Sequence, residues 1–88
     1  MKGILWHAHA KERLTHRNID RGLVLRAIEK PDQIIVSGKR RVVHKRYHDD
    51  RSRKEYLLRI FLEEHQQMTV VLSVYRTSKI NKYWREER

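Results

Sequence analysis

The single proline of this 88-residue chain, Pro31, separates two parts of the sequence that differ in the spacing of their apolar residues. Before Pro31, apolar residues recur every three or four positions, which is the spacing of one face of an α-helix. After it, apolar and polar residues alternate in β-branched runs that are typical of strands. Helices followed by sequential strands predict an α+β fold, in which the helices cover one face of an antiparallel sheet.

Two helices are predicted before Pro31. The first covers residues 7–17 and ends at Asn18, a residue that tolerates the left-handed conformation found at helix C-termini. The second begins after Asp20, whose side chain is placed to accept hydrogen bonds from the first backbone N–H groups. It ends before Pro31, because a proline pushes the preceding residue out of the helical region. The apolar stripe of the first helix consists of Trp6, Ala10 and Leu14.

Four strands are predicted after Pro31, at residues 33–36, 40–48, 56–63 and 68–75. The third is apolar on most of both faces, which predicts a central position in the sheet. Helical spacing then returns in Ile80, Tyr83 and Trp84. We therefore expect a single domain over residues 1–88, with two N-terminal helices packed on a four-stranded antiparallel sheet and a short C-terminal helical turn. The face of the last strand that meets the helices is expected to carry Met68, Val70, Leu72 and Val74.

Net charge and composition narrow the class of function. The chain has 21 Lys and Arg against 11 Asp and Glu, a formal net charge of +10, which favours a polyanionic partner. Its length excludes an enzyme with separate cofactor and substrate domains. The absence of cysteine excludes a thiolate site and a disulfide. The first apolar run, at residues 4–6, is too short for a signal peptide or a membrane span, so we expect a cytoplasmic protein with no membrane partner.

The excess positive charge is concentrated between residues 38 and 59, where nine Lys and Arg face three acidic residues. Such a cluster suits a phosphate backbone, because each neutralised phosphate releases counterions. The alternative is a solvated hairpin whose charges prevent association of sheet edges. Neither helix concentrates base-reading side chains, so RNA is favoured over sequence-specific binding to duplex DNA. The candidate RNA-binding residues in this region are Lys39, Arg40, Arg41, Lys45, Arg46 and the aromatic Tyr47.

Arg59 is the charged residue whose position most indicates a specific role. It shares a face of the predicted central strand with Leu57 and Phe61, where a guanidinium is partly desolvated and requires an anionic partner. Strand alternation places Tyr75 of the next strand on the same face, near Arg59. The alternative is an ion pair with a glutamate of the same strand, at position 55 or 63.

These residue types suit metal-independent cleavage of RNA. That reaction requires a base for the 2′-hydroxyl, cations for the phosphorane charge and an acid for the leaving oxygen. Arg76 and Lys79 follow the last strand and are expected to close the site around Arg59 and Tyr75. The six histidines lack the spacing of a metal site, and we expect neither a metal nor a cofactor.

Four segments, taken together, resemble a known family. They are His9-Ala10-x-x-Arg13-Leu14-x-x-Arg17-x-Ile19, Val24-x-x-Ala27-Ile28-x-x-Pro31, Tyr56-Leu57-Leu58-Arg59-Ile60 and Val74-Tyr75-x-Thr77-Ser78-Lys79-Ile80. The family comprises small bacterial and archaeal domains related to the RelE and BrnT toxins. The resemblance implies a helix-helix-sheet fold, metal-independent endoribonuclease activity on mRNA, free or ribosome-bound, and neutralisation by a small acidic antitoxin.

Carried over by position, the resemblance adds two residues of the His-Ala-x-x-Arg element, His9 and Arg13. The expected catalytic residues are then His9, Arg59, Tyr75, Arg76 and Lys79, while Arg13 joins the RNA-binding set. The expected function is the toxin component of a type II toxin–antitoxin system. Two alternatives stay open, an RNA-binding module without catalysis and a protein-interaction domain that docks an acidic partner.

Overall fold

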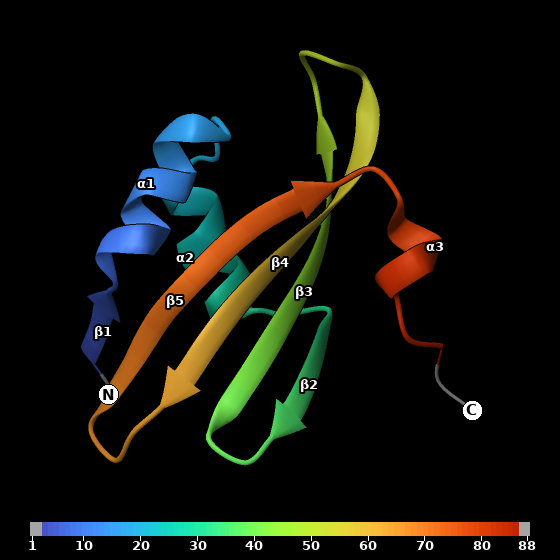
Figure 1. Ribbon diagram of the computed structural model, residues 1–88. Helices are drawn as coiled ribbons and strands as arrows, with labels where there is room; N and C mark the ends of the chain where they lie inside the picture. The colour runs from blue at the N-terminus through green and yellow to red at the C-terminus, as the bar shows by residue number, and fades with distance from the viewer. Residues whose placement is uncertain (1–2, 87–88) are drawn as a thin grey trace.

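The computed structural model describes residues 3–86 and contains a five-stranded sheet with two helices packed on one face (Figure 1). The strand order is β1-β5-β4-β3-β2, with β1 parallel to β5 and every other pair antiparallel. A third short helix follows the last strand. The elements are β1 (Gly3–Trp6), α1 (Ala8–His16), α2 (Arg21–Glu29), β2 (Gln33–Ser37), β3 (Arg40–Asp49), β4 (Lys54–Glu64), β5 (Met68–Thr77) and α3 (Ile80–Tyr83). The α+β class is therefore confirmed.

The expectation of a four-stranded, wholly antiparallel sheet is wrong, because β1 adds a parallel edge strand. Its residues pair with the start of β5, from Gly3 opposite Met68 to Trp6 opposite Val71. Alternation over four residues is too short to reveal a strand, and the partner lies at the other end of the chain. Trp6 also fits the helical spacing of the segment that follows it, and its burial in the core satisfies either arrangement.

Both long helices begin and end at polar signals in the sequence. In α1, the Nδ1 atom of the preceding His7 accepts a hydrogen bond from the His9 backbone, and Asn18 beyond its end adopts a left-handed φ of 53°. In α2, the Asp20 side chain accepts from the Gly22 backbone at 3.4 Å, as predicted. The helix ends at Glu29, two residues before Pro31.

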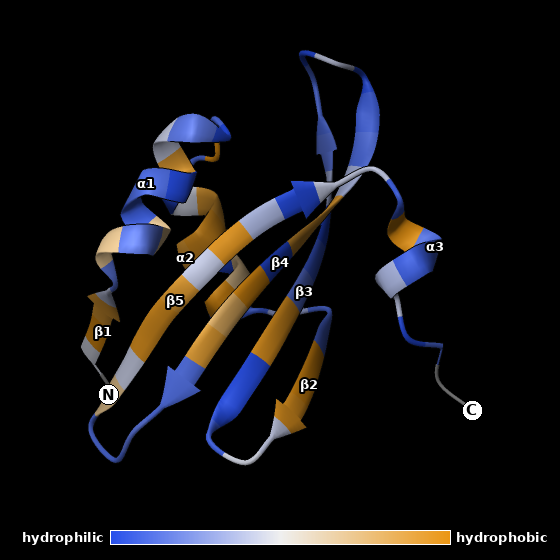
Figure 2. Ribbon diagram, viewed as in Figure 1, coloured by the Kyte–Doolittle hydropathy of each residue, from blue (hydrophilic) through white to orange (hydrophobic). Residues whose placement is uncertain are grey.

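β4 occupies the centre of the sheet, as its two apolar faces predicted. Leu57, Leu58 and Ile60 are inaccessible to solvent. Leu58 and Ile60 belong to the core between sheet and helices, whereas Leu57 is buried on the other face and lies outside that core cluster. The long β3–β4 hairpin is hydrophilic at its far end, where it extends beyond the helices (Figure 2).

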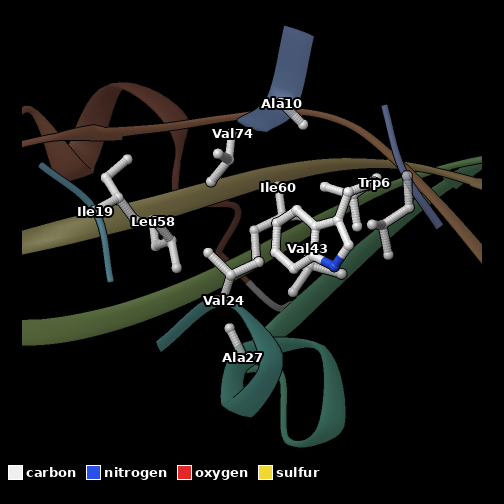
Figure 3. Packing of buried hydrophobic residues seen from close by; sticks show 11 residues of the cluster. Trp6, Ala10, Ile19, Val24, Ala27, Val43, Leu58, Ile60 and Val74 are labelled. Atoms are coloured by element: carbon white, nitrogen blue, oxygen red, sulfur yellow. The ribbon is translucent and has the colours of Figure 1, made fainter. Parts of the chain in front are cut away.

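The core lies between one face of the sheet and the two long helices (Figure 3). Val24 and Ala27 of α2 and Ala10 of α1 supply its helical side. From β5 it takes Val71 and Val74, not the expected alternating set from Met68 to Val74. A register shift between Phe61 and Leu62 causes this difference. Phe61 lies opposite Ser73 and Leu62 opposite Val71, so β5 carries an extra residue and its alternation reverses there.

Replacing Ile60 with alanine should lower the free energy of unfolding by about 2–5 kcal/mol, because it leaves a cavity in a fully buried site. Ile34→Ala is the matched control, since Ile34 is 52% exposed, and it should change that free energy much less. Urea denaturation followed by circular dichroism measures both. Equal losses for the two variants would contradict the placement of the core.

Candidate functional site

The open face of the sheet, which the two long helices do not cover, carries one row of polar side chains across four strands. Cα pairing places Gln33 of β2 opposite His44 of β3, His44 opposite Arg59 of β4, and Arg59 opposite Tyr75 of β5. Directly opposed residues on neighbouring strands point to the same face and lie close enough to interact. We call these four residues the polar row.

Arg59 is the centre of the polar row. Its Nε donates a hydrogen bond to His44 Nε2 at 3.1 Å, and Nη1 donates to the Tyr75 hydroxyl. The guanidinium carbon lies 4.3 Å from the Tyr83 ring centroid and 5.2 Å from that of Phe61. Within residues 3–86, no carboxylate forms an ion pair with Arg59. Its neighbours are therefore neutral hydrogen-bond acceptors and aromatic faces, which hold the guanidinium without cancelling its charge.

The alternative of an ion pair with a neighbouring glutamate of β4 is not observed. Glu55 lies 3.3 Å from His48 Nδ1, and Glu63 contacts Arg40 Nε at 3.2 Å and His65 Nε2 at 2.8 Å. Both glutamates are thus engaged with other partners at the ends of the strand.

His44 orients Arg59 and is itself fully buried. Because its Nε2 accepts from Arg59, the ring proton sits on Nδ1, which donates to Gln33 Oε1 at 3.1 Å. Burial lowers the pKa of His44 below its ordinary value, and the positive charges of Arg59 and Arg85 lower it further. The imidazole is thus held neutral in a single tautomer, as an acceptor for Arg59.

The C-terminal segment is fastened over the polar row by Gln33. The Gln33 side-chain amide donates to the Arg85 carbonyl, while its Oε1 accepts from the Arg85 backbone N–H at 3.2 Å. The neighbouring Trp84 ring stacks on His44 with a centroid separation of 6.4 Å, and the Arg46 guanidinium lies 5.1 Å from the Trp84 centroid. The segment that follows α3 therefore covers His44 and separates it from solvent.

Two tyrosine side chains lie beside Arg59. Tyr75 and Tyr83 meet edge to face, with ring centroids 6.2 Å apart. The hydrogen bond from the Tyr75 hydroxyl lowers the pKa of Tyr83, and the nearby charges of Lys82 and Arg59 act in the same direction. Arg59, Tyr75 and Tyr83 thus form a continuous path of donors and acceptors, and Tyr83 is partly exposed at its outer end.

Of the expected catalytic residues, Arg59 and Tyr75 contact each other, whereas His9 and Lys79 make their hydrogen bonds with other residues. His9 lies on α1, where its Nε2 accepts from Arg13 Nε at 3.3 Å. Lys79 is exposed between β5 and α3, and its backbone N–H donates to the Thr77 side chain.

Arg76 lies on the opposite face of the sheet from Arg59, contrary to expectation. Its Nη1 is 3.4 Å from the Tyr47 hydroxyl and 3.7 Å from Asp49 Oδ2, and its guanidinium carbon is 4.3 Å from the Tyr56 centroid. The hydrogen bond with Tyr47 raises the pKa of Arg76. The physical reason is the period of two along a strand, because Tyr75 and Arg76 are consecutive and point to opposite faces.

The expected RNA-binding residues are likewise divided by strand alternation. Arg46 lies at the margin of the polar row, over Trp84, and Arg40 pairs with Glu63. Lys45 points to the helical side, where its Nζ is 3.4 Å from Asp32 and 3.0 Å from the Lys30 carbonyl. The remaining members are Lys39 in the β2–β3 turn, Arg41 bonded to the Gly38 carbonyl, Tyr47 against the core, and Arg13 on α1.

The sequence pattern does not indicate that His44, Gln33, Tyr83 and the C-terminal segment are parts of the site. His44 and Gln33 share the alternation phase of their own strands, but only the register between strands shows that they oppose Arg59. The helical spacing of Tyr83 gives it no position relative to the sheet. Among residues 3–86, no three His, Asp or Glu side chains lie close enough to hold a metal ion. No helix within those residues is long and apolar enough to cross a membrane.

The free energy of unfolding should fall as the pH drops below about 6.5, the ordinary pKa of histidine. The folded pKa of His44 is lowered, so below that pH the unfolded chain binds a proton at this residue that the folded chain excludes. Urea denaturation between about pH 7.5 and pH 5.5 should show a smaller decrease for His44→Gln than for the wild type. An NMR titration placing the His44 pKa at or above 6.5 would contradict the neutral, buried state.

Comparison with known proteins gives one match. No curated protein and no solved structure matches the chain. The family model that matches is described as a domain of unknown function, DUF4258, and it covers residues 6–80. That span includes the whole polar row and stops before Tyr83. The chain therefore belongs to the DUF4258 family of domains of unknown function.

Proposed function

We propose that this protein is a metal-independent endoribonuclease whose reactive centre is Arg59 on the open face of the sheet. The observation that carries the proposal is the uncompensated charge of Arg59, which has two neutral hydrogen-bond acceptors and three aromatic rings around it. A guanidinium held in this way remains free to bind a phosphate, and its orientation is set before the substrate arrives. The net charge of +10 attracts a polyanion to this surface.

The chemistry requires no metal. The 2′-hydroxyl of a ribose attacks the adjacent phosphorus, and Arg59 stabilises the negative charge that builds on the non-bridging oxygens. Tyr83 accepts the 2′-hydroxyl proton as it passes its own phenolic proton to Tyr75, so that neither tyrosine carries a charge before or after the step. Tyr75 gives its proton to the leaving 5′-oxygen and is restored by Tyr83 through their hydrogen bond. The products are a 2′,3′-cyclic phosphate and a 5′-hydroxyl.

His44 acts in this scheme as a positioning residue. It is inaccessible to solvent, and both ring nitrogens are engaged, one with Arg59 and one with Gln33. Because its pKa is lowered, it remains a neutral acceptor near pH 7 and does not repel the guanidinium. His9 and Arg76, which the sequence placed among the catalytic residues, have no step here because neither lies beside Arg59.

The likeness of the sequence to RelE and BrnT toxins supports a proposal for the biological substrate. We propose mRNA, free or on the ribosome, and a role as the toxin component of a type II toxin–antitoxin system. The charge of the protein and the accessible rim of the polar row support a nucleic acid of this kind.

A second function, RNA binding without cleavage, is favoured by one feature of the same surface. Tyr83 and Trp84 are partly exposed aromatic rings next to Arg59 and Arg46. Aromatic faces flanked by cations bind unpaired bases by stacking, without any chemical step. Intact RNA after tight, salt-dependent binding would favour this function over catalysis.

An acidic protein partner is a further proposal, for which the free edge of β2 provides the surface. Within residues 3–86 no strand lies beyond β2, and Ile34 and Val36 on it are 52% and 60% exposed. Strand edges of this kind pair with an extended segment of another chain. The charge of +10 disfavours a second copy of this protein and favours an acidic chain.

Arg59→Ala should reduce the rate of RNA cleavage by about 10²–10³-fold, the usual effect of removing one donor to a developing oxyanion. Arg59→Lys should also be impaired, because an ammonium cannot contact His44 and Tyr75 at once. Arg26→Ala, on exposed α2, is the matched control and should cleave at the wild-type rate. The assay follows end-labelled RNA, with EDTA present, and identifies the cyclic phosphate end.

The same proteins should be checked by circular dichroism, so that loss of activity is separated from loss of fold. If folded wild-type protein cleaves neither free RNA nor mRNA on translating ribosomes, the endoribonuclease proposal is rejected. If Arg59→Ala cleaves as fast as Arg26→Ala, the reactive centre is elsewhere.

Val36→Glu should abolish binding of the acidic protein partner while leaving RNA cleavage unchanged, because the added carboxylate at the free edge of β2 repels an acidic chain. Arg59→Ala serves as the converse control and should retain the partner. Native mass spectrometry of complexes isolated from the source cells identifies the partner and its charge. A partner that is basic, or that stays bound to Val36→Glu, would contradict this surface.

A further inference from the structure

One face of α1, extended by its C-cap residue, carries three basic side chains that the chemistry above does not use. His9, Arg13 and Arg17 lie four residues apart, so they line one side of the helix, each about 6 Å further along its axis. We call these residues the α1 row. Ala10 and Leu14, which face the core, separate the row from Lys11 on the other side of the helix.

The α1 row leads to the polar row around an edge of the sheet. β1 ends at Trp6, opposite Val71. On this side of β5, away from β4, residues 72–77 therefore have no neighbouring strand within the described chain. α1 continues from β1 along this part of β5 (Figure 1). Arg17 ends the helix, and its guanidinium carbon lies 5.9 Å from the Tyr75 ring centroid. The last cation of the row is therefore next to a member of the proposed reactive centre.

The charges of Arg13 and Arg17 in the α1 row are not used in ion pairs within residues 3–86. The side chain of Arg13 donates to His9, and neither Arg13 nor Arg17 forms an ion pair with a carboxylate in residues 3–86. Arg17 closes the helix through its backbone N–H, which donates to the Arg13 carbonyl at 3.0 Å. Its side chain makes no contribution to that cap. A purely solvated helix face would not require the last cation to lie over Tyr75.

We propose that the α1 row binds the ribose-phosphate backbone of single-stranded RNA and leads it to Arg59, with Arg17 holding a phosphate next to the reacting one. This inference rests on the proposed endoribonuclease function and names the path of its substrate. Unpaired RNA suits the path, because the rings of Tyr75 and Tyr83 at its end stack on bases that a duplex keeps covered. His9 and Arg13 then contact RNA away from the chemistry, consistent with their distance from Arg59 along the helix.

The test measures binding separately from cleavage, using fluorescence anisotropy with a labelled 2′-O-methyl oligonucleotide that lacks the attacking hydroxyl. Affinity is recorded over a range of salt concentrations for wild type, Arg13→Ala, Arg17→Ala and Arg17→Lys. Lys11→Ala is the matched control, because it removes one charge from the opposite side of the same helix. Circular dichroism confirms that each variant is folded.

Each alanine variant of the α1 row should reduce affinity several-fold and reduce the slope of log affinity against log salt by about 0.7, the value for one lost phosphate contact on a single strand. Arg17→Lys should retain the slope, and Lys11→Ala should behave as wild type. If the alanine variants of the α1 row behave as Lys11→Ala, or if wild type does not bind the oligonucleotide, the proposed RNA path along the α1 row is rejected.

The failure of this proposal is distinguishable from the failure of the endoribonuclease proposal. If wild type cleaves RNA and both Arg13→Ala and Arg17→Ala retain full affinity, only the proposed RNA path along the α1 row is rejected. If wild type and the variants bind with the expected slopes but wild type never cleaves RNA, the endoribonuclease proposal is rejected and the RNA path along the α1 row stands. An acidic polypeptide that binds wild type more tightly than the oligonucleotide does, and loses affinity in the same variants, assigns the row to a protein partner and rejects RNA as its ligand.

Discussion

The structure of the open face depends on a single cation held at the centre of the sheet. Removing a guanidinium from water is costly unless its hydrogen-bonding groups find new partners. For Arg59 the partners are His44, the Tyr75 hydroxyl and the faces of three aromatic rings, all without formal charge. Such partners solvate the cation while preserving its attraction for an anion. An ion pair in the same place would have stabilised the arginine but would also have neutralised its charge, so that it could no longer attract a phosphate.

The other features of the site follow from holding that cation. His44 must be neutral and must carry its proton on Nδ1, which requires the acceptor that Gln33 provides. Gln33 in turn binds the backbone of Arg85, so the C-terminal segment covers the histidine and keeps it dry. Burial then lowers the pKa of His44 and maintains its neutral state. Fold, protonation and orientation of the cation therefore support one another.

Strand pairing divides the basic side chains of the chain between the two faces of the sheet. Side chains one residue apart along a strand face opposite sides, so Arg76 joins Tyr47 and Asp49 while Tyr75 joins Arg59. Lys45 is likewise engaged on the helical side, with Asp32, while Arg46 reaches the rim of the site. Cations that are neighbours in a strand sequence therefore lie on opposite faces and do not act together. In the α1 row, by contrast, residues four positions apart lie on the same side of a helix.

The sequence by itself determined the types of element and most of their boundaries, because periodicity, Asp20, Asn18 and Pro31 act locally along the chain. It also determined the central position of β4, from its two apolar faces, and the shared face of Arg59 and Tyr75, from strand alternation. Only the tertiary structure decided the addition of β1, the bulge that reverses β5, and the row that unites Gln33, His44, Arg59 and Tyr75. Each depends on pairing between distant segments, and a local pattern contains no information on register.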